Sequence, residues 1–134
     1  MSAEDFVFTL INIWFGHFLA DFFLQTTEMA DNKFVQTRNG TYWCTIHVIV
    51  YTLTIMLFPE QKDVVAFLGI FIPHWIIDRY SLAYKWMKIT GGSAMLSGNK
   101  EVASHPFGPV VYVVMDQMLH LFSLYLLLRY ISVF

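Results

Sequence analysis

The sequence is poor in charged residues and in cysteine. Only 13% of its 134 residues are charged and the net charge is −2, whereas an average soluble domain carries ~25% charged residues. Without a basic excess, nothing indicates a nucleic-acid-binding protein. The single cysteine, Cys44, excludes an intramolecular disulfide and a cysteine-based zinc framework. Hydrophobic residues make up 57% and aromatic residues 18%, which excludes disorder and indicates a membrane protein.

Four long apolar stretches account for well over half of the chain. A helix needs roughly 20 apolar residues to cross ~30 Å of hydrocarbon, and the stretches that qualify are about 6–25, 41–58, 64–80 and 109–133. They should be helical, because lipid offers no partner to backbone polar groups. The sequence predicts an all-α membrane protein with one domain over 1–134. We expect a four-helix antiparallel bundle with short loops and one longer loop between the third and fourth helices.

The cationic residues are distributed unevenly between the predicted linkers. Six of the eight lie in the first and third linkers: Lys33, Arg38, Arg79, Lys85, Lys88 and Lys100. The positive-inside rule therefore places these linkers in the cytoplasm and both termini outside. The acidic start, Met1–Asp5, lacks the basic region of a secretory signal, so the first stretch is interpreted as a membrane span. Ser81–Met87 is expected to extend the third helix past the membrane face, until Gly91-Gly92 ends it.

Seven ionisable residues lie inside the predicted spans, where such residues are costly and usually functional. They are His17, Asp21, His47, His74, Asp78, Asp116 and His120. Three spans hold a His and an Asp four residues apart, which places both side chains on one helical face and is a spacing used by helical metal ligands. Most of the seven lie about 6–16 Å from the cytoplasmic ends of their spans. We expect them to meet in the cytoplasmic half of one bundle.

Histidine and aspartate together suit a borderline divalent ion, Zn²⁺ first, with Mn²⁺ or Fe²⁺ as alternatives. A mononuclear catalytic site needs three protein ligands and a water, so seven candidates are a surplus. Either two ions share the site or some aspartates orient histidines from outside it. Asp21 and Asp116 are the candidates for a catalytic general base. Gln25, Tyr51 and Gln117 are expected to support the ligands through hydrogen bonds.

These residues leave three functions open. The first is an intramembrane metal-dependent hydrolase, whose amphiphilic substrate carries an ester, amide or phosphoester bond. The second is a carrier or channel for a metal ion or protons, which needs polar groups through to the outer face, where the spans are almost wholly apolar. A pore of four short helices would also require a homo-oligomer. The third is a non-catalytic membrane protein with a structural metal or a polar packing network.

Four short motifs follow one another along nearly the whole chain. They are His17-Phe-Leu-Ala-Asp21-Phe-Phe-Leu-Gln25 with Met29-Ala30 and Asn32-Lys33, His47 with Tyr51, His74-Trp-Ile-Ile-Asp78, and Asp116-Gln117-Met-Leu-His120. Together they resemble the DUF3307 family. The resemblance implies a small multi-pass protein of bacteria or their phages, with the inner membrane as its location and the lipid bilayer as its partner. It also implies that the His and Asp positions belong together, and it supplies no substrate.

Overall fold

The computed structural model describes residues 2–58, 63–90 and 108–131, and the regular structure in these residues is entirely helical. The elements in chain order are α1 (Ala3–Phe18), the π-helical turn η1 (Leu19–Phe23), α2 (Thr27–Asn32), α3 (Arg38–Ile55), α4 (Val64–Arg79), α5 (Leu82–Thr90), α6 (Gly108–Leu126) and the π-helical turn η3 (Leu127–Ile131). The all-helical prediction is therefore confirmed. The long loop predicted after the third span falls on 91–107, outside the described residues.

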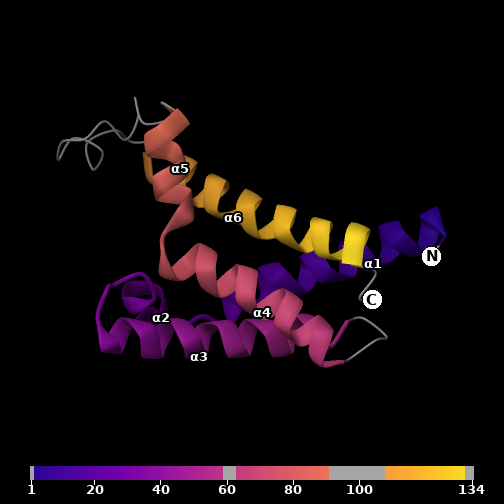
Figure 1. Cartoon of the computed structure of the whole chain (residues 1–134), viewed down its shortest axis with the longest axis horizontal. Helices are drawn as coiled ribbons and strands as arrows, with labels where there is room; N and C mark the ends of the chain where they lie inside the picture. Colours follow the sequence, from indigo (N-terminus) through magenta and orange to yellow (C-terminus); the bar gives the residue numbers. More distant parts are fainter. Residues whose placement is uncertain (1, 59–62, 91–107, 132–134) are drawn as a thin grey trace.

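The predicted spans correspond to four long helical segments that pack as an antiparallel bundle. These segments are α1 with η1, α3, α4, and α6 with η3. Each packs against two others, in the cyclic order α1, α3, α4, α6, and successive segments run in opposite directions (Figure 1). The start of α1 and the end of α6 lie at one end of the bundle, whereas α2 and α5 lie at the other. This is the up-down-up-down arrangement that short connections favour.

Polar residues start four of the helices. A cap residue accepts a hydrogen bond from a backbone N–H of the first turn, which would otherwise lack a partner. The capping pairs are Ser2 with Asp5, Thr26 with Met29, Thr37 with Gly40, and Asp63 with Ala66. The second pair starts α2, which lies in the first linker, where the sequence predicted no helix.

α4 and α5 are separate helices, so the expectation that Ser81–Met87 extends the third helix is wrong. Ser81 adopts a φ of 48°, in the left-handed region that residues other than glycine rarely enter. Its amide donates to the carbonyl of Asp78 at 3.1 Å, which closes a turn at the end of α4. The chain therefore changes direction, and α5 points away from the axis of α4 (Figure 1).

A buried arginine holds the first linker against the end of α4. The Arg79 guanidinium donates to the Val35 carbonyl at 2.8 Å and to the Thr41 hydroxyl at 3.1 Å. The Gln36 side-chain amide donates to the Arg79 carbonyl at 2.7 Å. Gly40, in the first turn of α3, packs directly on the Val35 carbonyl, where a Cβ would overlap the oxygen. These contacts fix the chain between α2 and α3.

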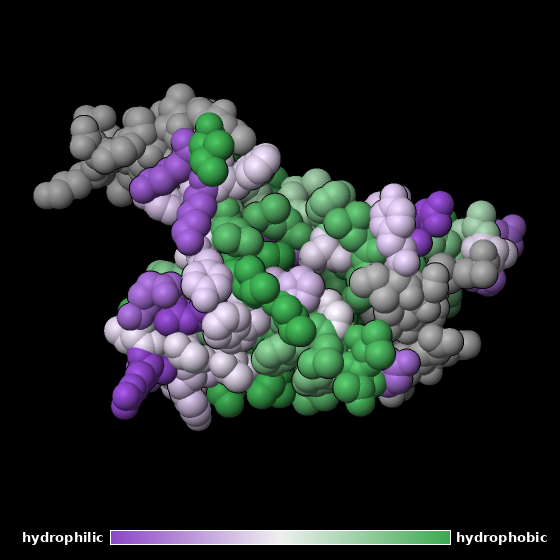
Figure 2. Space-filling view, in the orientation of Figure 1, coloured by the Kyte–Doolittle hydropathy of each residue, from purple (hydrophilic) through white to green (hydrophobic). Residues whose placement is uncertain are grey.

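Among the residues that the structure describes, two helical segments are long and apolar enough to cross a membrane, Ala3–Phe23 and Gly108–Tyr130. Only 28% of the residues in the apolar stretch of the first segment, and 17% in that of the second, are buried. Most of the side chains in these stretches therefore face outward. The other two predicted spans do not meet this criterion: α4 has 16 residues, about 24 Å at 1.5 Å per residue, and α3 begins with Arg38 and Asn39. Figure 2 shows apolar side chains over the middle of the bundle and hydrophilic ones over α2 and α5. The two apolar helices suggest association with a membrane.

We expect Gly40→Ala to destabilise the fold. The added methyl group must displace the backbone of the first linker, and overpacking of this kind costs about 1–3 kcal/mol. Gly69→Ala is the control, because its new Cβ lies 2.6 Å from the end of the Leu127 side chain, which can move. Thermal unfolding in detergent, followed by circular dichroism, should give a lower Tm for Gly40→Ala. Equal Tm values for the two variants would contradict this packing argument.

Candidate metal centre

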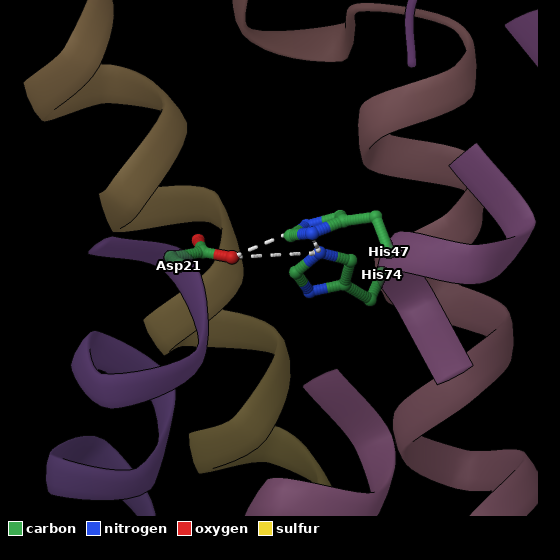
Figure 3. A group of neighbouring side chains, drawn as sticks. All are labelled: Asp21, His47 and His74. Carbon is green, nitrogen blue, oxygen red and sulfur yellow. Dashed lines mark hydrogen bonds and ion pairs between the residues drawn. The ribbon is translucent and has the colours of Figure 1, made fainter. Parts of the chain in front are cut away.

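Asp21 enters the bundle interior from the π-helical turn η1. A π-turn places an extra residue in the helix, and such turns are frequent at functional sites. The Asp21 side chain is 3% exposed and points toward the side chains of His47 on α3 and His74 on α4 (Figure 3). The side-chain amide of Gln25 donates to the Asp21 carbonyl at 3.2 Å. Gln25 therefore contacts the backbone of the turn that presents Asp21.

Asp21, His47 and His74 form a compact buried group (Figure 3). The Nε2 atoms of the two histidines lie 3.1 Å apart, and Asp21 Oδ1 lies 3.3 Å from His47 Nε2 and 3.9 Å from His74 Nε2. Ligand atoms at 2.0–2.1 Å from a tetrahedral zinc ion are about 3.3–3.4 Å from one another. The spacing of the three atoms therefore fits one shared ion.

Asp78 joins this group to a fourth helix. It lies one turn after His74 on α4, and its Oδ2 is 3.2 Å from both His47 Nε2 and His74 Nε2. Its other oxygen, Oδ1, lies 3.4 Å from His120 Nε2 on α6. His74, Asp78 and His120 thus form a second buried group that shares His74 with the first. Five of the seven predicted ligands are in these two groups, each of which could hold one metal ion.

Several buried atoms in the two groups lack a hydrogen-bond partner, which is uncommon in folded proteins and calls for an explanation. Within the described residues they are Asp21 Oδ1, His74 Nδ1 and His120 Nε2, and Asp78 Oδ2 is contacted through ion pairs alone. His120 Nδ1 donates to the Asp116 carbonyl at 2.8 Å, so the lone pair of Nε2 faces Asp78. Metal-ligating histidines have this arrangement, with one nitrogen on the metal and the other donating to a carbonyl. These residues therefore fit a bound cation.

Lys33 completes the surroundings of Asp78. Its Nζ lies 2.9 Å from Asp78 Oδ2, and its side chain is only 14% exposed. Burial lowers the pKa of Lys33, but the carboxylates of Asp78 and Asp21 raise it more, so the net pKa is above its ordinary value. In the sequence, Lys33 was one of the cationic residues that set the orientation and part of a motif, but it was not a predicted site residue. Its place in the Asn32-Lys33 motif was the signal that it belongs to the site.

The charges within contact of the two groups do not balance. Among the residues that the structure describes, three carboxylates, those of Asp21, Asp78 and Asp116, face one ammonium, that of Lys33. With neutral imidazoles, two negative charges have no counter-charge, and burying such charge is unfavourable. One divalent cation, or two imidazolium protons, would supply the missing charge. The convergence of carboxylate oxygens and Nε2 atoms in two compact groups fits the cation.

His17 lies beside the two groups and is a member of neither. The Tyr51 hydroxyl donates to His17 Nδ1 at 2.8 Å, and His17 Nε2–H donates to Gln117 Oε1 at 2.7 Å. Both ring nitrogens of His17 are therefore hydrogen-bonded within the protein, and the structure places this predicted ligand next to the two groups. The Gln117 amide in turn donates to Asp21 Oδ2 at 3.3 Å. Tyr51, His17 and Gln117 thus form a chain of hydrogen bonds that ends on the Asp21 carboxylate.

Asp116 also lies outside both groups, at the edge of a surface pocket. Its Oδ2 is 3.7 Å from His120 Nδ1 and its side chain is 15% exposed. The pocket has a volume of about 270 Å³ and lies between η1, α2 and α6, with Asp21, Lys33 and Asp116 in its wall. The site therefore combines a buried ligand group with a carboxylate and an ammonium that are reached from outside.

The DUF3307 family model, described as a protein of unknown function, matches residues 9–134. This chain belongs to the DUF3307 family. The matched range contains both ligand groups, and the resemblance inferred from the four motifs is confirmed. No curated protein and no solved structure matches this DUF3307 chain.

Metal removal is expected to destabilise the protein. An ion that binds only the native state at 100 times its dissociation constant adds about 2.7 kcal/mol of stability. Excess Zn²⁺ should therefore raise the Tm of chelator-treated protein in detergent, and His47→Gln should remove most of this rise. Asp31→Asn, which changes an exposed carboxylate on α2, is the control. A Tm that responds to none of Zn²⁺, Mn²⁺ and Fe²⁺ would count against a metal site.

Tyr51→Phe tests the hydrogen-bond chain that ends on Asp21. The variant keeps the ring and removes the hydroxyl that orients His17. Loss of an outer hydrogen bond typically lowers metal affinity about 10–100-fold, and we expect the lower end because Tyr51 acts through two further residues. Competition against a fluorescent zinc chelator measures the affinity, with the exposed Tyr42→Phe as control. Equal zinc affinities in the two variants would show that the hydrogen bonds from Tyr51 to Asp21 do not influence the metal ligands.

Proposed function

We propose that this chain is an intramembrane metal-dependent hydrolase that acts on an amphiphilic substrate. The observation that carries the proposal is the convergence of buried carboxylates and imidazoles beside a pocket that reaches the surface. A divalent cation held there supplies Lewis-acid chemistry and activates water near neutral pH. Zn²⁺ is the first choice, because imidazole and carboxylate ligands are common in its catalytic sites, and the carboxylate share keeps Mn²⁺ and Fe²⁺ as alternatives.

The proposal places all four long segments in a membrane. Several large apolar residues on α1 and α6 are more than half exposed, an arrangement that suits contact with lipid: Val7, Phe8, Ile11, Val110 and Val114. The cationic residues of the first linker and of α5 lie together at one end of the bundle. By the positive-inside rule this end faces the cytoplasm and the termini face outward. The proposed location is the inner membrane of a bacterium.

The interior favours a one-sided catalytic site over a transport path. On the side of the ligands toward the termini, the buried residues are mainly an apolar cluster that includes Ile13, Ile55, Ile70, Leu124 and Leu128, with Thr52 and Thr54 as buried polar residues and no ionisable side chain among the described buried residues there. A carrier or channel for a cation needs polar groups along this route. A purely structural metal would suit a closed site, whereas the wall of the surface pocket includes Asp21, a member of the first ligand group. These two features support an enzyme over the other two functions.

The residues divide into three roles in this proposal. Asp21, His47, His74 and Asp78 hold the cation, with His120 on the second oxygen of Asp78. Asp116 lines the pocket without belonging to either ligand group, so it is positioned to accept a proton from the attacking water. The Lys33 ammonium lines the same pocket and stabilises negative charge that develops on the substrate.

Hydrolysis of p-nitrophenyl laurate in detergent micelles tests the proposed function. Chelation should abolish turnover, and Zn²⁺ should restore it. Asp116→Asn should retain bound metal and lower turnover about 10²–10⁴-fold, as expected for a general base, whereas Asp31→Asn should match the wild type. Full activity in Asp116→Asn would remove its role as base. A metal-loaded protein that hydrolyses neither this ester nor an amide or phosphodiester of equal chain length would overturn the hydrolase proposal.

A further inference from the structure

The pocket beside the metal centre has a polar inner end and an apolar mouth. Its polar lining includes Asp21, Lys33 and Asp116. Its apolar lining includes Phe22 on η1, Phe34 in the first linker and Val113 on α6. These three apolar side chains are 55%, 45% and 44% exposed. The pocket therefore runs from the exposed side of the bundle toward the carboxylates, and its polarity changes along its length.

The position of the mouth fits the boundary between lipid and water. It opens beside α6, one of the two helices long and apolar enough to cross a membrane. α2 borders the same pocket, and its Glu28 and Asp31 are exposed. A molecule that enters here from the membrane has its apolar part beside α6 and its polar part at the level of α2. This is the orientation that a lipid-like molecule already has in a bilayer.

The size of the pocket limits what it encloses. Its volume of about 270 Å³ lies below the ~300–1,000 Å³ of pockets that enclose a whole drug-sized ligand. The pocket is therefore large enough for a polar head and the bond next to it, whereas a long alkyl chain would lie outside it, beside Phe22 and Val113.

The charge of the site selects among polar heads. Within the described residues, the three carboxylates, the Lys33 ammonium and one divalent cation would have no net formal charge. An anionic phosphodiester would add an uncompensated charge to this poorly solvated site, which is unfavourable. An uncharged ester or amide adds none, and its carbonyl oxygen accepts a hydrogen bond from the Lys33 ammonium.

We propose that this pocket is a lateral entrance from the membrane, and that its substrate is an amphiphile with an uncharged carboxylic ester or amide bond. This inference rests on the proposed hydrolase function. In the reaction, the water oxygen bonds to the acyl carbon as the acyl C–O or C–N bond breaks. Asp116 takes one water proton and passes it to the leaving alcohol or amine, so the products are an acid and that alcohol or amine.

Photo-crosslinking tests the entrance without relying on turnover. The probe is an alkyl methyl ketone with a diazirine in its chain, which presents an uncharged carbonyl and cannot be hydrolysed. Its anionic counterpart is an alkyl methyl phosphate with the same chain and diazirine. We expect the ketone to label peptides that contain Phe22, Phe34 or Val113, and to label them more strongly than the phosphate does.

Two neighbouring substitutions on α6 provide the matched comparison. Val113 and Val114 are both exposed, but Val113 lines the pocket. Val113→Trp should fill the mouth and reduce ketone labelling about tenfold, the change given by 1.4 kcal/mol of lost binding, whereas Val114→Trp should leave it unchanged. Ala30→Leu, which narrows the pocket from α2, provides a second variant in case Val113→Trp does not fold.

Metal content, measured on the same samples, separates this inference from the proposed function. Equal labelling of the Val113→Trp and Val114→Trp proteins, with metal bound in both, overturns the entrance and leaves the metal site standing. Stronger labelling by the phosphate overturns the uncharged substrate class. Absence of metal from folded wild-type protein overturns the proposed function, and this inference with it.

Discussion

The carboxylate of Asp78 joins three helices and a linker inside the bundle. One oxygen meets His47, His74 and Lys33, and the other faces His120. Breaking a buried ion pair by removing one partner typically costs about 3–5 kcal/mol, because the other charge is left without compensation. The positions of α3, α4, α6 and the first linker relative to one another are therefore coupled through this one side chain.

The site around Asp78 is bordered by apolar residues on one side and is accessible from a surface pocket on the other. Toward the termini, buried residues such as Ile55 and Leu124 form an apolar cluster. Toward α2, the chain of hydrogen bonds from Tyr51 and His17 ends on Asp21, whose carboxylate also lines the surface pocket. Low polarity behind the ligands strengthens their electrostatic interactions, and the pocket gives access from one side. A hydrolase needs both properties, whereas a transport path needs a second opening.

Much of the fold could be predicted from the sequence because long apolar helices have a simple signature of length and apolarity. The predicted first span, 6–25, corresponds to α1 and η1, which together cover Ala3–Phe23. The grouping of His74 with Asp78 followed from their helical spacing, and their meeting with Asp21 and His47 followed from depth in the bundle. Helical spacing and depth both depend only on distance along a helix, which can be counted from the sequence.

The features that the sequence did not reveal depend on tertiary contacts. The π-turn η1 and the left-handed Ser81 have no local signature in composition or periodicity. Lys33 reaches Asp78 from a linker, and its direction is set by how Arg79 holds that linker against α4. The two hydrogen bonds of His17 are made with Tyr51 and Gln117, which lie on other helices. The spacing between His17 and Asp21 along one helix could not reveal these partners.

The proposed function depends on a divalent cation between Asp21, His47, His74 and Asp78. X-ray absorption spectroscopy on protein purified in detergent without a chelating column, with metal content measured by mass spectrometry, tests this cation site. We expect near-stoichiometric metal with nitrogen and oxygen ligands at about 2.0–2.2 Å, outer scattering from imidazole rings, and loss of the metal in His74→Ala. Folded wild-type protein that binds no metal even after its addition would rule out the cation site.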